Sequence, residues 1–325
     1  MKEYPLVSLI IPCYNHTAFL DDCMRSILRQ DYPRLEIFIC DDCSSDGSYE
    51  RLLGYETALR ERFGRVSIRK NESNLGVTKN LNQMLRQAGG EYIKLLASDD
   101  FLADNAISSF VAFMQAHEET DVVFSNGYLV SEDQHIGIVG ESKIYPTAPD
   151  LELATLAERI FRSNELSAPC AFLRKAVFDR FGLYDERYAI EDLEFWLRLL
   201  RGGGCRFAFL DQPLLYYRRN ANSITSLVVN EKTDSRMLRF YSAELGILEA
   251  YRDLVPEELY AEAILWRLLA VYSFSVDNRL PKTRAFAEEK LKASPLWGKL
   301  KPGVKGKYRF VYVKQIVKKL LYGSG

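Results

Sequence analysis

Short apolar strands alternate with helical patterns over the first hundred residues, and this alternation is the strongest constraint on the fold. Apolar runs typical of strands cover residues 6–11, 35–40, 66–69 and 92–96, and a helical spacing of apolar side chains begins at Leu20. Such an alternation predicts a largely parallel, twisted sheet with helices on both faces. We therefore expect an α/β, Rossmann-like fold.

Polar residues follow three of the predicted strands directly. Asn15 comes shortly after the first strand, Asp42 after the second, and the pair Asp99 and Asp100 after the fourth. In open α/β sheets, ligands bind outside the carboxyl ends of the strands. The sequence therefore predicts one polar site, built from three separate segments, at that edge of the sheet.

The adjacent acids Asp99 and Asp100 favour a divalent cation. Two neighbouring carboxylates repel each other, and a metal ion is the usual reason to hold them together at the end of a strand. Mn²⁺ and Mg²⁺ take oxygen ligands, and one or two carboxylates with substrate phosphates are sufficient. The alternative, that one acid only caps the following helix, stays open at this point.

A series of motifs in a fixed order resembles family 2 glycosyltransferases of the A-type fold, the type that builds bacterial cell-surface polysaccharides. The motifs are PCYN at 12–15, DDCSSDGS at 41–48, NLG at 74–76, GEYI at 90–93, SDD at 98–100, FGLYDE at 181–186, IEDLEFWLRL at 190–199 and PLLYYRR at 213–219. The resemblance implies inverting, metal-dependent transfer of a sugar from a nucleotide-diphosphate sugar to an acceptor hydroxyl. The acceptor would be a saccharide or a lipid-linked saccharide.

The resemblance also implies roles for individual residues. Asp192 would be the catalytic base, with Glu191 beside it, and Asp99 and Asp100 would bind Mn²⁺ or Mg²⁺. The donor-binding residues would be Pro12, Tyr14, Asn15, Asp42, Lys79, Ser98 and Asp99.

Simpler alternatives stay open for several of these residues. Asp42 could serve only to form a turn, Asn15 only to cap a helix, and Lys79 only to face solvent. The acids at 191 and 192 could simply complement the dipole of the helix that follows.

Two positions depart from the common family pattern. Ala97 replaces the first acid of the usual Asp-x-Asp, so Asp99 is the expected direct metal ligand. Asn220 stands where many relatives carry histidine, which removes or weakens a histidine contribution to metal or diphosphate binding. The histidines that are present, at 16, 117 and 135, are isolated in the sequence and are expected to be surface or capping residues.

Patterns along the chain predict four parts. We expect a glycosyltransferase domain over 1–226, with a nucleotide-sugar half (1–100) and an acceptor half (101–226). A helical extension follows at 227–295, and a basic amphipathic tail at 296–325.

The basic tail suggests contact with a membrane. From residue 299 onward the chain carries eight Lys or Arg and no Asp or Glu, beside apolar residues at helical spacing. Such a segment suits peripheral contact with anionic lipid through residues 299–322. The alternative is a helix docked on the protein's own core.

Composition narrows the remaining choices. A net charge of −1 argues against a nucleic-acid binder. Six scattered cysteines and the absence of a signal-peptide pattern lead us to expect a cytoplasmic protein, at the inner face of the cell membrane if the tail binds lipid. A sugar-nucleotidyltransferase is an alternative function, but the segment after the first strand lacks its Gly-rich basic loop. A catalytically silent binding module is another.

Overall fold

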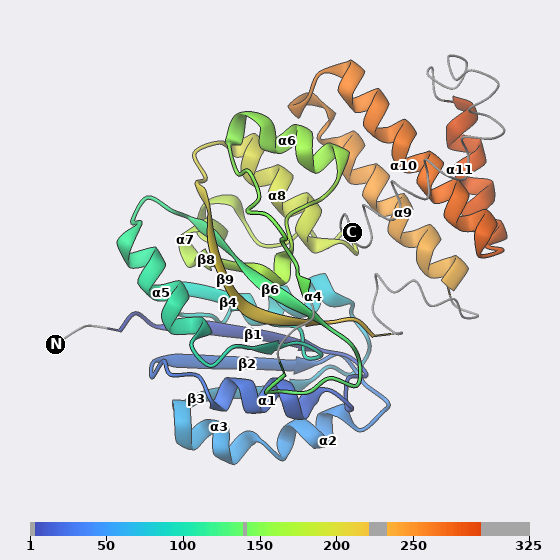
Figure 1. Ribbon diagram of the computed structural model, residues 1–325. Coiled ribbons are helices and arrows are strands. Elements are labelled where there is room, and N and C mark those ends of the chain that lie inside the picture. The colour runs from blue at the N-terminus through green and yellow to red at the C-terminus, as the bar shows by residue number, and fades with distance from the viewer. Residues whose placement is uncertain (1–3, 139–141, 221–232, 294–325) are drawn as a thin grey trace. The chain divides into compact units, whose positions relative to one another are not determined.

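The computed structural model describes residues 4–138, 142–220 and 233–293 (Figure 1). The chain divides into two compact units. The first comprises the described residues of 1–151, 166–187 and 194–220, and the second those of 152–165, 188–193 and 221–325. The second unit thus combines the C-terminal helices with two segments that precede them in the sequence.

The first four strands of the first unit form a parallel sheet. They are β1 (Val7–Cys13), β2 (Leu35–Asp41), β3 (Arg65–Lys70) and β4 (Tyr92–Leu95), in the spatial order β3-β2-β1-β4. Every residue of β2 is buried, and all of β1 except Pro12. The continuous apolar character of these strands follows from this burial on both faces of the sheet.

The rest of the sheet is mixed. It contains β5 (Phe101–Leu102), β6 (Val122–Val130), β7 (Ser142–Lys143), β8 (Ala171–Arg174) and β9 (Phe207–Arg218). Strand β8 pairs antiparallel with both β4 and β6, whereas β6 and β9 are parallel. Strand β8 begins opposite Phe124, the third residue of β6, and runs back toward the start of that strand. The parallel arrangement predicted from the sequence therefore describes the N-terminal half.

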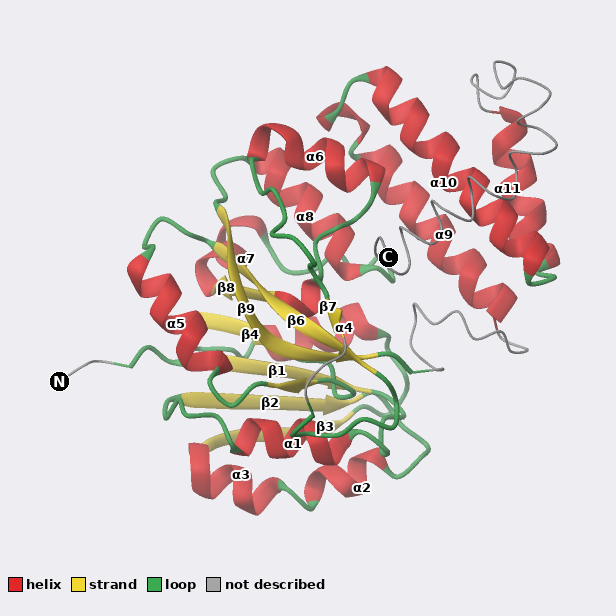
Figure 2. Cartoon of the chain, viewed as in Figure 1, coloured by secondary structure: helices red, strands yellow, loops and turns green. Residues whose placement is uncertain are grey.

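Helices flank the sheet on both faces (Figure 2). Helix α4 (Val77–Leu85) packs on β1 and β2, and α1 (Leu20–Leu28) packs against β5. The helices that begin in the first unit are α1 (Leu20–Leu28), α2 (Ser48–Leu53), α3 (Glu56–Phe63), α4 (Val77–Leu85), α5 (Ala106–Ala116) and α7 (Lys175–Phe181). The α/β class predicted from the sequence is confirmed.

The second unit is helical, as expected for a C-terminal extension. It contains α6 (Leu153–Arg162), the first residues of α8 (Glu191–Gly202), α9 (Thr233–Ala250), α10 (Glu257–Asp277) and α11 (Pro281–Ala293). Its core is an apolar cluster from α10 and α11: Leu265, Leu268, Val271, Tyr272, Ala287 and Leu291.

Helix α10 is long and apolar enough to cross a membrane, and it is the one helix among the described residues that meets this test. However, 61% of its most apolar stretch is buried inside the protein. A core helix of a globular domain has the same composition, so α10 carries no membrane assignment. The basic tail predicted over 296–325 lies outside the described residues.

Candidate active site

The segments after β1 and β2 are joined at the carboxyl edge of the sheet. Asn15 has a positive φ of 54°, its N–H donates to Ser44 Oγ (2.8 Å), and its side-chain oxygen accepts from the N–H of Ser45 (2.9 Å). The N–H of His16 donates to Ser48 Oγ (3.0 Å). Asn15 therefore has a turn-forming role in this structure, and its predicted contact with the donor stays a prediction.

Asp42 holds the loop before α4. Its Oδ1 accepts hydrogen bonds from Asn71 Nδ2 (2.8 Å) and the N–H of Leu75 (2.9 Å), and its Oδ2 accepts from the N–H of Gly76 (2.8 Å). The side chain is buried, and Gly76 has a φ of 83°, a conformation that favours glycine. Asp42 thus fixes the conformation of this loop, and its contact with the donor stays a prediction.

Asp99 lies between two polar side chains from distant segments. Its Oδ2 accepts a hydrogen bond from Asn220 Nδ2 (2.6 Å), and its Oδ1 lies 3.7 Å from His16 Nδ1. The same nitrogen of His16 lies 2.8 Å from the Oγ of Ser98, a buried residue. The segments that carry His16, Ser98 and Asn220 therefore meet at this carboxylate.

The expectation that His16 is an isolated surface or capping residue is wrong. Strands β1 and β4 are neighbours in the sheet, with Ile10 paired to Leu95, so the residues after both strands come together. His16 directly follows the PCYN motif, and this position next to a predicted site segment was the sequence feature that could have indicated its place in the site. The sequence predicts that the segments after these strands reach the same edge, but not which side chains touch there. It therefore could not identify Ser98 and Asp99 as the neighbours of His16.

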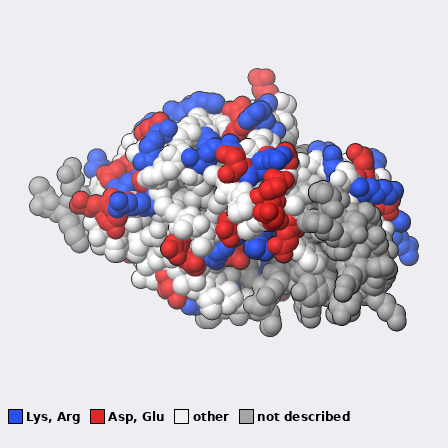
Figure 3. Space-filling model, turned by 90° about the horizontal axis from the view of Figure 1, so that it is seen from above, with Lys and Arg blue, Asp and Glu red and all other residues white. Residues whose placement is uncertain are grey.

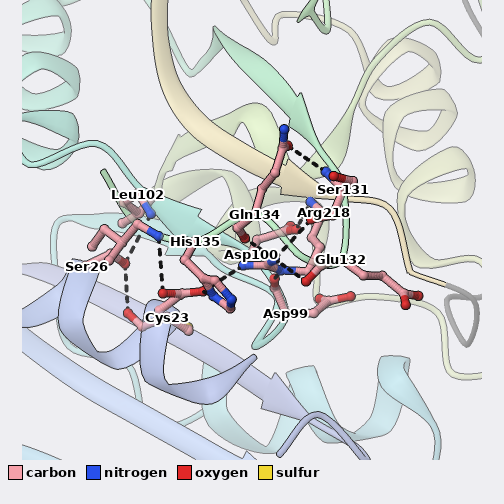
Figure 4. Close-up of polar contacts among 12 residues, drawn as sticks. Cys23, Ser26, Asp99, Asp100, Leu102, Ser131, Glu132, Gln134, His135 and Arg218 are labelled. Carbon is pink, nitrogen blue, oxygen red and sulfur yellow. Dashed lines mark hydrogen bonds and ion pairs between the residues drawn. The ribbon is translucent and has the colours of Figure 1, made fainter. Parts of the chain in front are cut away.

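Asp100 is buried beside Arg218 (Figure 4). Its Oδ1 accepts the backbone N–H of Arg218 (2.8 Å), and its Oδ2 has no hydrogen-bond partner within the described residues. Burial, followed by the charge of Asp99, raises the pKa of Asp100 well above its usual value. The two adjacent acids therefore have different environments, and their joint role as metal ligands stays a prediction.

The residues of this edge suit a cation that is completed by substrate. Among the described residues there is no group of three or more His, Cys, Asp and Glu that could hold a metal ion alone. Asp99, with His16 beside it, is an incomplete ligand set, and Mg²⁺ commonly binds to one or two carboxylates together with substrate phosphates.

The other predicted donor residues lie on the same edge or close to it. Pro12 is the second-last residue of β1 and is partly buried, and Tyr14 follows that strand with 47% of its surface exposed. Lys79 lies near the start of α4, and its side chain is exposed. None of these positions is in conflict with the predicted contacts.

Glu191 and Asp192 begin α8, within the second unit. Asp192 Oδ1 accepts the N–H of Leu193 (2.7 Å), and its Oδ2 lies 3.4 Å from Asn164 Nδ2. Burial raises the pKa of Asp192 to about 6. Burial and the neighbouring charge of Asp192 raise the pKa of Glu191 to about 8. Burial thus favours the protonated form of both carboxyls, and the role of Asp192 as the base stays a prediction.

Residues 8–182, more than half of the chain, match the sequence profile of Glycosyl transferase family 2. The chain belongs to this family, and it is a glycosyltransferase. The match removes the sugar-nucleotidyltransferase and the silent binding module as alternatives.

Several curated relatives carry names from polysaccharide biosynthesis. The putative colanic acid biosynthesis glycosyl transferase WcaA of Escherichia coli K12 is 30% identical over 200 residues, covering 62% of this chain and 68% of the relative. The putative teichuronic acid biosynthesis glycosyltransferase TuaG of Bacillus subtilis is 30% identical over 224 residues, covering 68% of this chain and 82% of the relative.

Solved structures share the fold. TarS residues 1–349 of Staphylococcus aureus, in complex with UDP-GlcNAc, match with a TM-score of 0.57 at 20% identity, covering 89% of this chain and 92% of that one. The mannosyltransferase PcManGT of Pyrobaculum calidifontis, in complex with GDP-Man and Mn²⁺, matches with a TM-score of 0.56 at 16% identity, covering 100% and 89%. These likenesses establish the glycosyltransferase A-type architecture.

Proposed function

We propose that this protein is an inverting, metal-dependent glycosyltransferase that uses a nucleotide-diphosphate sugar. Its acceptor is a hydroxyl of a growing or lipid-linked surface polysaccharide. The observation that carries the proposal is the environment of Asp99, whose carboxylate lies at the carboxyl edge of the sheet between His16 and Asn220. A structural neighbour with the same fold was solved with GDP-Man and Mn²⁺, which supports the choice of donor class and cation.

Asp99 would hold the cation, with His16 beside it. A bound Mn²⁺ or Mg²⁺ neutralises the negative charge that develops on the departing diphosphate. Asn220 keeps the Asp99 carboxylate in place through its 2.6 Å hydrogen bond to Oδ2, which leaves Oδ1 for the cation. The loop held by Asp42 and the exposed ring of Tyr14 would border the nucleotide.

Asp192 would take the proton from the acceptor hydroxyl. A general base works best when its pKa lies near the operating pH, and burial raises the pKa of Asp192 to about 6. Glu191, whose pKa is raised to about 8, would stay protonated and neutral beside it. Direct attack by the activated hydroxyl is a single displacement, so it inverts the anomeric centre and requires no covalent intermediate.

The protein would act at the cytoplasmic face of the membrane. The eight bases from residue 299 onward favour peripheral contact with anionic lipid. Acidic and basic side chains are interspersed on the face seen in Figure 3, among the described residues. A lipid-linked acceptor would make this location useful.

The metal role is tested with the wild type and Asp99→Asn. A thermal-shift screen of nucleotide sugars with Mn²⁺ identifies the donor, because a bound ligand raises the melting temperature by mass action. We expect EDTA to abolish transfer and Mn²⁺ or Mg²⁺ to restore it. Asp99→Asn should lower transfer about 100-fold or more, since the diphosphate loses its counter-ion. Full activity in EDTA would refute the metal role.

A further inference from the structure

Arg218, the last residue of β9, is completely enclosed and has many polar partners (Figure 4). Its Nε donates to the backbone oxygen of Asp99 (2.9 Å), and one terminal nitrogen donates to Asp22 Oδ2 on α1 (2.9 Å). The other terminal nitrogen contacts the backbone oxygens of Ser131 (3.1 Å), Glu132 (3.1 Å) and Gln134. The guanidinium thus joins three segments that are far apart in the sequence.

The surroundings of Arg218 require an arginine. The guanidinium carbon lies 5.0 Å from the centre of the Phe19 ring and 5.4 Å from that of Phe101, so aromatic rings cover it. A planar group with five N–H donors can reach all of these oxygens at once. A lysine ammonium has three donors on a flexible stem and cannot reproduce the arrangement.

Asp22 fastens the same loop a second time. His135 Nδ1 lies 2.8 Å from Asp22 Oδ2, and the N–H of Ile136 donates to Asp22 Oδ1 (3.2 Å). Arg218 therefore binds the backbone oxygens at the start of the loop 131–136. Asp22 contacts the last two residues of that loop, His135 and Ile136. Because Arg218 also binds Asp22 and the backbone oxygen of Asp99, it connects this loop to the turn that carries Asp99.

Both acids of the SDD motif depend on the end of β9. The backbone N–H of Arg218 donates to Asp100 Oδ1, and its side chain binds the backbone oxygen of Asp99. Asn220, two residues further on, binds the Asp99 carboxylate itself. Backbone and side chain of Asp99 are thus both positioned from one short segment.

We propose that Arg218 is a positioning residue for the donor site. It holds the Asp99–Asp100 turn and the 131–136 loop in one arrangement, so that the Asp99 carboxylate is already oriented for the cation and diphosphate. The inference rests on the proposed function, because it assigns the cation to Asp99. Arg218 acts through Asp99 and makes no contact with the reacting atoms itself.

Arg174 provides a matched control within the same unit. It also lies over an aromatic ring (Tyr92, 5.4 Å) and donates to backbone oxygens, those of Thr120 (2.8 Å) and Met114 (2.9 Å). However, Arg174 pairs with Tyr92, which begins β4, whereas the Asp99 turn follows the end of that strand. Arg174→Lys therefore makes the same chemical change at the opposite end of the sheet.

The test compares Arg218→Lys with Arg174→Lys in the full chain. Binding of Mn²⁺ is measured by electron paramagnetic resonance in the presence of UDP and, separately, of GDP. Loss of a residue that orients a metal ligand typically weakens metal binding about 10- to 100-fold, and we expect this for Arg218→Lys. Arg174→Lys should stay within about twofold of the wild type, because distant changes act independently, even if both variants melt earlier.

The outcomes separate this inference from the proposed function. Wild-type Mn²⁺ affinity in folded Arg218→Lys would overturn the inference alone. If the wild type fails to bind Mn²⁺ in the presence of UDP and also in the presence of GDP, the metal role is refuted, and the inference with it. If Arg218→Lys does not fold, the inference is tested with Asp22→Asn, which removes the charge that Arg218 binds on α1. We expect weaker Mn²⁺ binding and faster hydrogen exchange over 131–136, and no change in either would overturn the inference.

Discussion

Glu191 and Asp192 are adjacent carboxyl residues whose surroundings separate their pKa values. Asp192 accepts the N–H of Leu193, a contact that stabilises its charged form, whereas Glu191 is affected by the charge of Asp192 itself. Neighbouring acids with separated pKa values are a common way to divide proton acceptance from a neutral role. At residue scale, the proposed base is Asp192, the acid that the family resemblance places in this role.

Substitution by isosteric amides tests this division. Asp192→Asn should leave the affinity for the donor nearly unchanged and lower turnover about 100- to 10,000-fold, the usual contribution of a general base. Glu191→Gln should reduce turnover much less, because that side chain is already neutral near pH 7. Steady-state kinetics at saturating donor make the comparison, and the reverse order of effects would identify Glu191 as the base.

The same pair should make stability depend on pH. The pKa values in the folded chain, about 6 and about 8, lie above those of the unfolded chain, so the folded chain holds more protons between these limits. The contribution of this pair to stability should therefore be greatest below the ordinary values of 3.8 and 4.5, where both states are protonated. It should decrease as pH rises from there to about 6 for Asp192 and to about 8 for Glu191.

Thermal melting of Glu191→Gln measures this dependence. At pH 8 the variant should melt at a higher temperature than the wild type. The difference should be smaller at pH 5, where the folded wild-type carboxyl is still protonated. The exposed Glu118 serves as a control, since Glu118→Gln should show no such pH-dependent difference. Equal shifts at both pH values for Glu191→Gln would contradict the raised pKa.

At the scale of elements, the loop before α4 depends on one buried carboxylate. Asp42 accepts from the N–H groups of Leu75 and Gly76, so the loop conformation is set by a residue at the end of β2. Asp42→Ala should weaken binding of the nucleotide diphosphate with little change in turnover at saturating donor. The reason is that a loop shaped by Asp42 binds the nucleotide equally well in the ground state and in the transition state.

Asp42→Asn is the informative companion variant. Its amide keeps one acceptor oxygen, so it should bind the nucleotide more tightly than Asp42→Ala and less tightly than the wild type. Calorimetric titration with UDP and GDP gives the affinities. Unchanged affinity in Asp42→Ala, together with a large fall in turnover, would place this residue in the chemical step.

The sheet shows which features of elements can be predicted from local sequence. The strands β1 to β4 alternate with helices at short spacing, and the sequence predicts both their existence and their parallel direction. Strand β8 has four residues, and its partners are distant in the chain: Ala171 pairs with Phe124 of β6, and Arg174 with Tyr92 of β4. Its antiparallel direction depends on a long connection, which leaves no periodic signal in the sequence.

At the scale of the whole molecule, the basic tail predicts binding to a membrane surface. Each Lys or Arg near an anionic surface contributes about 1 kcal/mol, and salt screens this attraction. The full chain should therefore sediment with anionic liposomes better than with neutral ones, and less at high salt. Truncation after Pro295 should abolish sedimentation and preserve transfer to a soluble acceptor analogue.

A charge-reversed variant supports the interpretation of that truncation. Lys318→Glu combined with Lys319→Glu should weaken binding to anionic liposomes and leave the melting temperature unchanged. A full chain that ignores anionic liposomes, or a truncated chain that unfolds, would instead indicate that the apolar residues of the tail pack against the protein.

The sequence alone determined the α/β class and the strands that end in polar residues, and it predicted Asp42, Asp99 and Asp192 as site residues. These follow from periodicity and motif, which involve residues close together in the chain. Only the tertiary structure placed His16 beside Ser98, 82 positions away, and Arg218 beside Asp22, 196 positions away. Such contacts depend on which strands are neighbours and where their ends meet. Sheet adjacency is decided by packing of the whole chain, so no local pattern records it.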